Sequence, residues 1–195
     1  MSRPVRLGVV LLAAGRSERF GSNKLLCDFA GKPMVCHALA CMQALPAHRR
    51  CAVTGDARLA QLASAYGCDV IRNDQPERGQ AHSIHLGVDA MQGMDAVLLL
   101  VGDQPRLTKE SLSRLLEAFC ASDKGIACLC DQTHRGNPAV FSARYFPALL
   151  ALLGDRGAKG IIKAHEDDLV VVPCLNSSEL GDADTPQALE QLLKK

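Results

Sequence analysis

An apolar run followed at once by a loop of small and cationic residues restricts the fold of this chain more than any other stretch. The run, VRLGVVLL, reads as a buried strand, and the loop after it, LLAAGRSERFGSNK, covers residues 11–24. Small residues at 13–15 let backbone N–H groups approach a ligand closely. The basic side chains of the loop suit phosphate oxygens, and they are Arg16, Arg19 and Lys24. The loop therefore predicts a site for an anion, most simply a polyphosphate.

The spacing of this loop excludes two better-known phosphate-binding motifs. Gly21 is followed by Ser22, Asn23 and Lys24, so the loop contains neither G-x-x-x-x-G-K-[ST] nor G-x-G-x-x-G. A P-loop NTPase or a dinucleotide-binding dehydrogenase is therefore not the first interpretation. Considered alone, the loop leaves one alternative open, which is an ordinary strand-to-helix connection with solvated charges.

Strand-like apolar runs alternate with helical patterns along most of the chain, as they do in α/β proteins. The most continuous run, DAVLLLV at 95–101, is apolar on both faces and belongs at the centre of a parallel sheet covered by helices. We expect an α/β fold with a doubly wound, mostly parallel sheet, in a single domain over residues 1–195. Because ligands bind at the carboxyl ends of such strands, GDQP, which follows the run, should share a crevice with the first loop.

The later part of the chain alternates less regularly. Thr108 is expected to cap a helix over 109–121, and the residues 133–141 predict a turn into a short strand. Helical patterns cover 144–154 and 158–165, and a final helix is expected from Pro186 onward. This irregular part could form the second half of a site.

Composition narrows the partners. The net charge is +1 and no run of lysine or arginine occurs, which argues against a nucleic-acid partner and against an anionic membrane surface. The nine cysteines are odd in number, scattered among apolar neighbours and without a C-x-x-C pair, so they read as reduced core thiols. No apolar run approaches the length of a membrane span. We expect a cytoplasmic protein that binds its nucleotide as a small molecule.

Hard-metal ligands occur where the sheet is expected to end. Asp103 of GDQP would stand at the tip of a buried strand facing the cationic loop, which makes sense if Mg²⁺ lies between it and a polyphosphate. A second carboxylate could come from Asp182 or Asp184 in GDADTP, with Asp155 a weaker candidate. The alternatives are a turn-forming role for Asp103 before Pro105, and helix capping for the two later aspartates.

Two pairs of softer ligands invite a metal interpretation that their surroundings do not support. His82 and His85 lie three apart on an expected helix without a nearby third ligand, so exposed or hydrogen-bonded side chains are the simpler interpretation. Cys128 and Cys130 would share one face of a strand, again without further ligands. We predict no metal at either pair.

Several motifs in order along the chain resemble those of one enzyme family. They are LAAGRSERFGSNK, NDQPERGQAHS, GDQPRL, RGNPAVF, LLGDRGAK and DADTP. Together they are similar to the molybdenum cofactor cytidylyltransferases, a group within the wider cofactor and sugar nucleotidyltransferases, and the resemblance covers almost the whole chain. It implies a Rossmann-like nucleotidyltransferase fold and transfer of a nucleotidyl group with Mg²⁺, or with Mn²⁺ in its place.

The resemblance also implies roles for individual residues. The catalytic residues would be Arg19, Lys24 and Asp103. Mg²⁺ would be held by Asp103 and Asp184. The nucleotide would be bound by Leu12, Ala13, Ala14, Gly15, Arg16, Lys24, Asn73, Gly79, Ser83 and Asp103. The acceptor would be bound by Gln104, Pro105, Gly136, Asn137, Pro138 and Asp155. Asn137 stands where the family more often has histidine, in a turn expected to face the acceptor. This departure therefore affects the identity of the acceptor more than the type of reaction.

The implied reaction is attack by a phosphate oxygen of molybdopterin, in the molybdenum cofactor, on the α-phosphorus of CTP, with release of pyrophosphate. Guanylyl-transferring relatives carry LAGG where this chain has LAAG, so the methyl group of Ala14 favours CTP over GTP. A recipient molybdoenzyme or its chaperone would be a further partner. Two alternatives stay open: a transferase that activates a sugar phosphate or another phosphorylated alcohol, and a non-catalytic module that binds nucleotide or delivers cofactor.

Overall fold

The described residues form an α/β structure around one seven-stranded sheet. The computed structural model describes residues 5–15, 23–132, 135–183 and 185–194. In spatial order the strands are β5 (Asp69–Arg72), β4 (Arg49–Thr54), β1 (Leu7–Leu12), β6 (Ala96–Val101), β8 (Arg135–Ser142), β7 (Ile126–Cys130) and β9 (Leu169–Pro173). Of these, β8 runs antiparallel to its two neighbours, while the other printed pairs are parallel. The expected doubly wound, mostly parallel sheet is confirmed.

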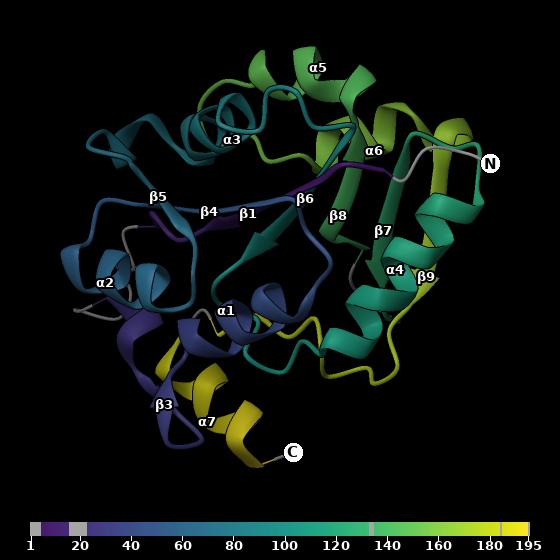
Figure 1. Ribbon diagram of the computed structural model, residues 1–195. Helices are drawn as coiled ribbons and strands as arrows, with labels where there is room; N and C mark the ends of the chain where they lie inside the picture. The colour runs from purple at the N-terminus through teal and green to yellow at the C-terminus, as the bar shows by residue number, and fades with distance from the viewer. Residues whose placement is uncertain (1–4, 16–22, 133–134, 184, 195) are drawn as a thin grey trace.

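Helices cover both faces of this sheet (Figure 1). One face packs against α1 (Val35–Ala44), α2 (Ala57–Ala65) and α4 (Lys109–Ala121), and the other against α3 (Gln80–Asp89), α5 (Phe146–Leu150) and α6 (Lys159–Ala164). Strand β1 shows why: Val9 and Leu11 belong to the first apolar cluster, whereas Val10 and Leu12 belong to the second. Since alternate side chains of a strand point to opposite faces, a strand that is apolar throughout needs helices on both sides.

Local signals fix several helix ends. The hydroxyl of Thr108 accepts a hydrogen bond from Ser111 N and caps α4, as the sequence predicted. Asp56 caps α2 by accepting from Arg58 N and Leu59 N. The remaining short elements are η2 (Lys24–Leu26), β2 (Asp28–Phe29), β3 (Lys32–Pro33), η3 (Pro76–Arg78), η4 (Ala143–Tyr145) and η5 (Glu166–Asp168), and the last helix is α7 (Pro186–Lys194).

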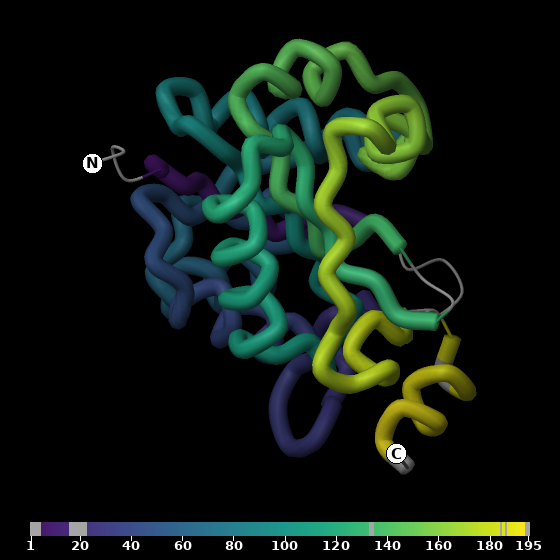
Figure 2. Tube along the Cα trace, turned by 90° about the vertical axis from the view of Figure 1, so that its right-hand side faces the viewer, coloured from purple at the N-terminus to yellow at the C-terminus, as the bar shows by residue number. Residues whose placement is uncertain are grey.

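The segment after β9 returns toward the carboxyl ends of the central strands, on the side of α1 and α4. Leu180, Ala183 and Leu192 belong to the same apolar cluster as those helices. Figures 1 and 2 show α7, in yellow, at that end of the molecule. The return matters because it brings the GDADTP motif next to the end of β6.

The helix expected over 144–154 is shorter than its apolar pattern. It ends as α5 at Leu150, and Leu153 is 76% exposed. Gly154 has a φ of +64°, and its carbonyl accepts a hydrogen bond from Ala81 N at the start of α3. The chain therefore leaves the helix to meet α3. Strand β8, expected to be short, spans eight residues because it pairs with both β6 and β7.

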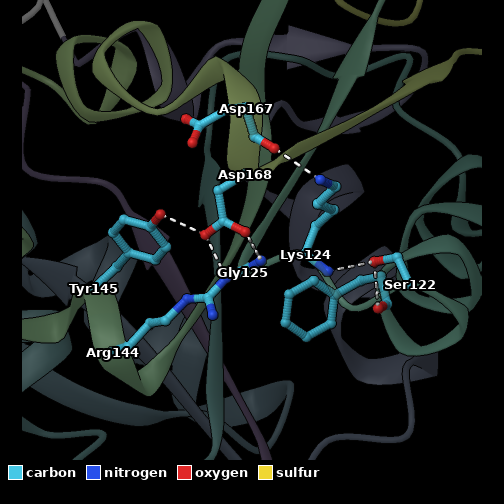
Figure 3. A network of polar contacts seen from close by, with 8 residues as sticks. Ser122, Lys124, Gly125, Arg144, Tyr145, Asp167 and Asp168 are labelled. Atoms are coloured by element: carbon cyan, nitrogen blue, oxygen red, sulfur yellow. Dashed lines mark hydrogen bonds and ion pairs between the residues drawn. The ribbon is translucent and has the colours of Figure 1, made fainter.

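A polar network joins the amino ends of β7 and β9, at the opposite end of the sheet from the GDQP motif (Figure 3). The Asp168 carboxylate accepts hydrogen bonds from Tyr145 Oη at 2.5 Å and from Gly125 N at 3.0 Å, and it pairs with the Arg144 guanidinium. Lys124 Nζ donates to the backbone carbonyl of Asp167. These contacts join the starts of β7 and β9 to the residues that follow β8.

All nine cysteines are free, but the expectation that they lie in the core holds only in part. Cys36, Cys51, Cys68 and Cys128 are buried, whereas Cys120 is exposed. Burial raises the pKa of the Cys51 thiol to about 12. Within the described ranges, no helix has both the length and the apolar character needed to span a membrane.

Candidate functional site

The carboxyl ends of β1 and β6 lie side by side at the centre of the sheet. Leu12 pairs with Val101 in the parallel register, and Gly102 N donates to Leu12 O at 3.3 Å. On the other side, Ala13 N donates to Val53 O at 2.9 Å. Residues 13–15 and GDQP therefore begin side by side at the same end of the sheet. Ala14 is half-buried and Gly15 is exposed, so the backbone after Ala13 is accessible.

Lys24 contacts Asp103 at this end of the sheet. Its Nζ lies 2.7 Å from Asp103 Oδ2, and the two side chains are 15% and 21% exposed. Gly102 makes room for the approach, because a Cβ there would stand 3.0 Å from a methyl group of Leu25. The two residues expected to act on phosphate and metal are thus in direct contact.

Asn23 orients the start of the Lys24 turn, and sequence reasoning missed it. Its Oδ1 accepts from Leu25 N, and its Nδ2 donates to Asp56 Oδ2 at 3.0 Å. Burial raises the pKa of the Asp56 carboxyl, but hydrogen bonds from Leu59 N, Asn23 and Arg58 N outweigh burial and leave that pKa below its usual value. Asp56 is therefore ionised at neutral pH and joins the cap of α2 to the Lys24 turn.

The loop between β5 and α3 supplies the next expected nucleotide residues. Asn73 is buried, and its Nδ2 donates to Ser83 Oγ at 3.0 Å. Gly79 has a φ of +82°, and a Cβ there would stand 2.5 Å from the Gly154 carbonyl. Asn73 and Ser83 thus form one hydrogen-bonded unit, while Gly79 permits close packing of the loop against the turn at 154–155.

A cavity of about 360 Å³ opens beside Asp103. Its lining residues are Gln80, Val101, Asp103, Gln104, Arg135, Asn137, Asp155, Gly157, Ala158, Lys159, Leu180 and Asp182. Of the residues expected to bind the acceptor, Gln104, Asn137 and Asp155 line this cavity. Pro105 and Pro138 are buried and do not line it, and Gly136 lies beneath the side chain of Lys159.

The C-terminal segment is tied to GDQP by several hydrogen bonds. Ala183 N donates to Asp103 O at 3.1 Å, and Gln104 Nε2 donates to Asp182 Oδ1 at 3.0 Å. Glu179 is 1% exposed and accepts from Thr108 Oγ1 at 3.0 Å. A buried carboxylate in a polar stretch gave no signal in the sequence, yet it clamps this segment to the loop after β6.

The oxygen donors at this end fit a hard divalent cation. The carboxylates of Asp103 and Asp182 share the cavity, and carboxylate oxygen is the donor that Mg²⁺ and Mn²⁺ prefer. Over the described ranges, no group of three or more acidic, histidine or cysteine side chains forms a complete metal cage. That is the expected situation if the substrate's phosphates supply further ligands. Asp184, Arg16 and Arg19 lie outside the described residues.

The histidine pair behaves as an ordinary part of α3. His85 Nδ1 lies 3.2 Å from Leu150 O, at hydrogen-bonding distance. Burial lowers the pKa of His82, and the neighbouring Arg78 lowers it further, so its imidazole is neutral near pH 7. Neither side chain lines the cavity.

Two cations of the cavity, Arg135 and Lys159, were not singled out from the sequence. They lie in the RGNP and GDRGAK motifs, so the motifs themselves were the available signal. Their neighbours Gly136, Asn137 and Asp155 were predicted instead. Which member of a motif faces a cavity depends on tertiary packing, and that is absent from the local pattern.

Comparison with known proteins assigns the family. The sequence model of the MobA-like NTP transferase domain matches residues 9–169. The chain belongs to this family. The match runs from β1 to the start of β9 and so includes Lys24, Asp103 and the cavity walls formed by β8 and α6.

Proteins similar to this MobA-like NTP transferase carry names that refer to different functions. "Purine catabolism protein PucB" of Bacillus subtilis is 29% identical over 98% of each chain. A "probable molybdenum cofactor guanylyltransferase" of Pyrococcus horikoshii is 28% identical over 82% of this chain and 79% of its own. "Bifunctional protein GlmU" of Rhizorhabdus wittichii is 34% identical over 60% of this chain but only 27% of its own length.

Solved structures agree with the fold. Rv0371c of Mycobacterium tuberculosis is 25% identical with a TM-score of 0.83 over the whole of both chains. A complex of Rv0371c with manganese gives a TM-score of 0.78 at 22% identity, covering 97% of this chain and 99% of that one. CMP:2-keto-3-deoxy-manno-octonic acid synthetase complexed with CTP gives 0.71 at 17% identity over 97% of each chain, so this is a nucleotidyltransferase fold.

Proposed function

We propose that this MobA-like enzyme transfers CMP from CTP to the terminal phosphate of molybdopterin in the molybdenum cofactor and releases pyrophosphate. The observation that carries the proposal is the contact between Lys24 Nζ and Asp103 Oδ2, at 2.7 Å, beside a cavity of about 360 Å³. A phosphate-binding cation and a metal-binding carboxylate then meet at the edge of a space large enough for a second substrate. The molybdenum cofactor named for the Pyrococcus horikoshii relative is consistent with this acceptor.

The chemistry of the lining favours an acceptor that is already an anion. Within the described residues, the cavity wall contains no hydroxyl, thiol or imidazole side chain that could act as a protein nucleophile or carry a proton away. A phosphate oxygen of the acceptor needs no general base. It forms the new bond to the α-phosphorus of CTP, and the bond from that phosphorus to pyrophosphate breaks, with the electron pair leaving on pyrophosphate.

The protein's part is alignment and neutralisation of charge. Lys24 would move from Asp103 to the triphosphate, where charge builds up on the leaving pyrophosphate, and Arg19 would assist it. Mg²⁺ or Mn²⁺, held by Asp103 and Asp184, would supply further positive charge to the phosphates when bound. Ala183 N, bonded to Asp103 O, fixes the residue before Asp184 in the sequence next to the first carboxylate.

The preference for cytosine over guanine rests on the loop after β1. The half-buried Ala14 lies between the buried Ala13 and the exposed Gly15, in the backbone stretch that would contact the base. Its methyl group narrows that space. The buried Asn73–Ser83 pair would complete the base site from the far side of the crevice.

Pyrophosphate release tests the proposal. The enzyme is incubated with Mg²⁺, each of the four nucleoside triphosphates, and either molybdenum cofactor or a panel of sugar phosphates. We expect release with CTP and molybdenum cofactor to exceed every other combination. Release with a sugar phosphate alone would favour the broader activation of phosphorylated alcohols, and no release with any acceptor would favour a non-catalytic delivery module.

A further inference from the structure

Two cations line one part of the cavity. Lys159 opens α6, Arg135 opens β8, and both side chains line the cavity. Arg135 Nη2 lies 3.3 Å from Glu166 Oε1. For Lys159, no carboxylate among the described residues lies within ion-pairing distance. A cation that faces a cavity without a protein partner is suited to an anionic ligand.

The stem of Lys159 occupies space that a side chain at Gly136 would fill. A Cβ on Gly136 would stand 2.9 Å from Lys159 Cγ and 3.1 Å from its Cε, so the stem lies flat across the backbone of β8. Gly136 also has a φ of +140°, which side chains rarely adopt. Because β8 neighbours β6 in the sheet, the wall that carries Lys159 adjoins the strand that leads to Asp103.

We propose that Lys159, supported by Arg135, holds the phosphate group of the acceptor in this cavity, and that Gly136, which has no side chain, leaves room for the lysine stem to lie there. The inference rests on the proposed transferase function, since that function requires a phosphate of the acceptor to lie beside the nucleotide. Lys24 then serves the nucleotide and Lys159 serves the acceptor. The two anions, which repel each other, are then held by two separate cations.

Steady-state kinetics can distinguish the role of Lys159 in acceptor binding from the role of Lys24 in nucleotide binding. Lys159→Ala should raise KM for molybdenum cofactor by about ten- to a hundredfold, the usual cost of losing a hydrogen bond to a charged group, and should leave KM for CTP within about twofold. Lys159→Arg should recover part of the loss. Lys163→Ala is the matched control, because Lys163 lies on the same helix and is exposed outside the cavity. Equal KM values for Lys159→Ala and wild type would overturn the assignment.

A second readout does not depend on turnover. Pyridoxal 5′-phosphate, a phosphate-bearing aldehyde, is allowed to react with lysines and is fixed by borohydride, and the labelled peptides are identified by mass spectrometry. We expect Lys159 to be labelled about tenfold faster than Lys163, and inorganic phosphate to protect Lys159 selectively. Equal labelling without protection would contradict the phosphate site. If labelling behaves as expected and no acceptor is turned over, the transferase proposal fails and the phosphate site stands.

Discussion

Lys24 Nζ lies 2.7 Å from Asp103 Oδ2, although the two residues are 79 positions apart in the sequence. The contact joins the turn after β1 to the end of β6. Bound triphosphate and metal would compete for the same two groups, so we expect this pair to open when substrate binds. Before substrate binds, the pair thus holds the Lys24 ammonium and the Asp103 carboxylate in place at the end of the sheet.

Lys24→Ala should weaken CTP binding and slow the chemical step. The lysine would lie closest to phosphates that become more negative as pyrophosphate leaves, and electrostatic groups of this kind contribute on the order of a hundredfold in rate. Calorimetry of CTP binding and single-turnover rates measure the two effects. Lys32→Ala, in the β3 hairpin, is the control. If the two variants bound CTP equally well, the phosphate-binding loop would lie elsewhere.

Asp103→Asn should lower turnover by about a hundredfold or more at saturating Mg²⁺, because the amide keeps the shape but loses the charge that holds the metal. Stability should fall by only about 1–3 kcal/mol, since the amide oxygen can still accept from Lys24 Nζ although the charge of this largely buried pair is lost. Thermal unfolding and kcat are measured on the same preparation. Near wild-type turnover would remove Asp103 from the site.

The two aspartates of GDADTP should differ. Asp184→Asn is expected to behave like Asp103→Asn, because Asp184 is the proposed second metal ligand. Asp182→Asn should cost less, because Asp182 Oδ1 accepts a hydrogen bond from Gln104 Nε2 and an amide oxygen can still accept it. Titration of activity against Mg²⁺ concentration measures both variants. The reverse order would show that Asp182 is the ligand.

Ala14→Gly should relax the choice of base without reversing it. One methyl group in a pocket discriminates by about 1–3 kcal/mol, and contacts from the Asn73–Ser83 pair would remain. The measurement is kcat/KM for CTP and for GTP on wild type and variant. A ratio that does not change, or equal use of both nucleotides by wild type, would remove this loop from base recognition.

Asp168→Asn should affect stability and leave turnover unchanged, since the network of Figure 3 lies at the far end of the sheet. Burial raises the pKa of Asp168, but hydrogen bonds from Tyr145 and Gly125 N and the charge of Arg144 outweigh it, so the folded pKa lies below the usual 3.8. The stabilisation is therefore present above pH 3.8 and is lost as pH falls through the folded pKa.

Urea unfolding at pH 7 should show a loss of about 1–3 kcal/mol for Asp168→Asn, and the difference from wild type should shrink near pH 3. Asp167→Asn is the matched control, because Asp167 is exposed and its backbone carbonyl, not its carboxylate, accepts from Lys124. A loss that is the same at both pH values would indicate that the ionised carboxylate is not responsible.

The sheet and the position of GDQP at the end of a strand followed from local patterns. The run 96–101 is apolar at every position, and that pattern favours a strand covered on both faces, with GDQP at its carboxyl end. The position of Thr108 before a helical pattern predicted the start of α4. Such features are predictable because each depends on residues that are neighbours in the sequence.

Features that depend on packing between distant segments were missed. The hairpin of β2 and β3 has strands of only two residues around Ala30 and Gly31, too short for a periodic signal. Glu179 is buried because the C-terminal segment folds back on Thr108, and Lys159 faces the cavity because its stem crosses Gly136. No local sequence pattern predicts contacts between residues so far apart in the chain, so the structure was needed to find them.

The central claim is that a phosphate of the acceptor attacks the α-phosphorus of CTP in this site. Its most direct test is mass spectrometry of the product that wild-type enzyme forms from molybdenum cofactor, CTP and Mg²⁺. The account predicts an acceptor that has gained one cytidylyl group, linked to its phosphate, with one pyrophosphate released for each product molecule. Unmodified acceptor together with CMP or intact CTP would contradict it.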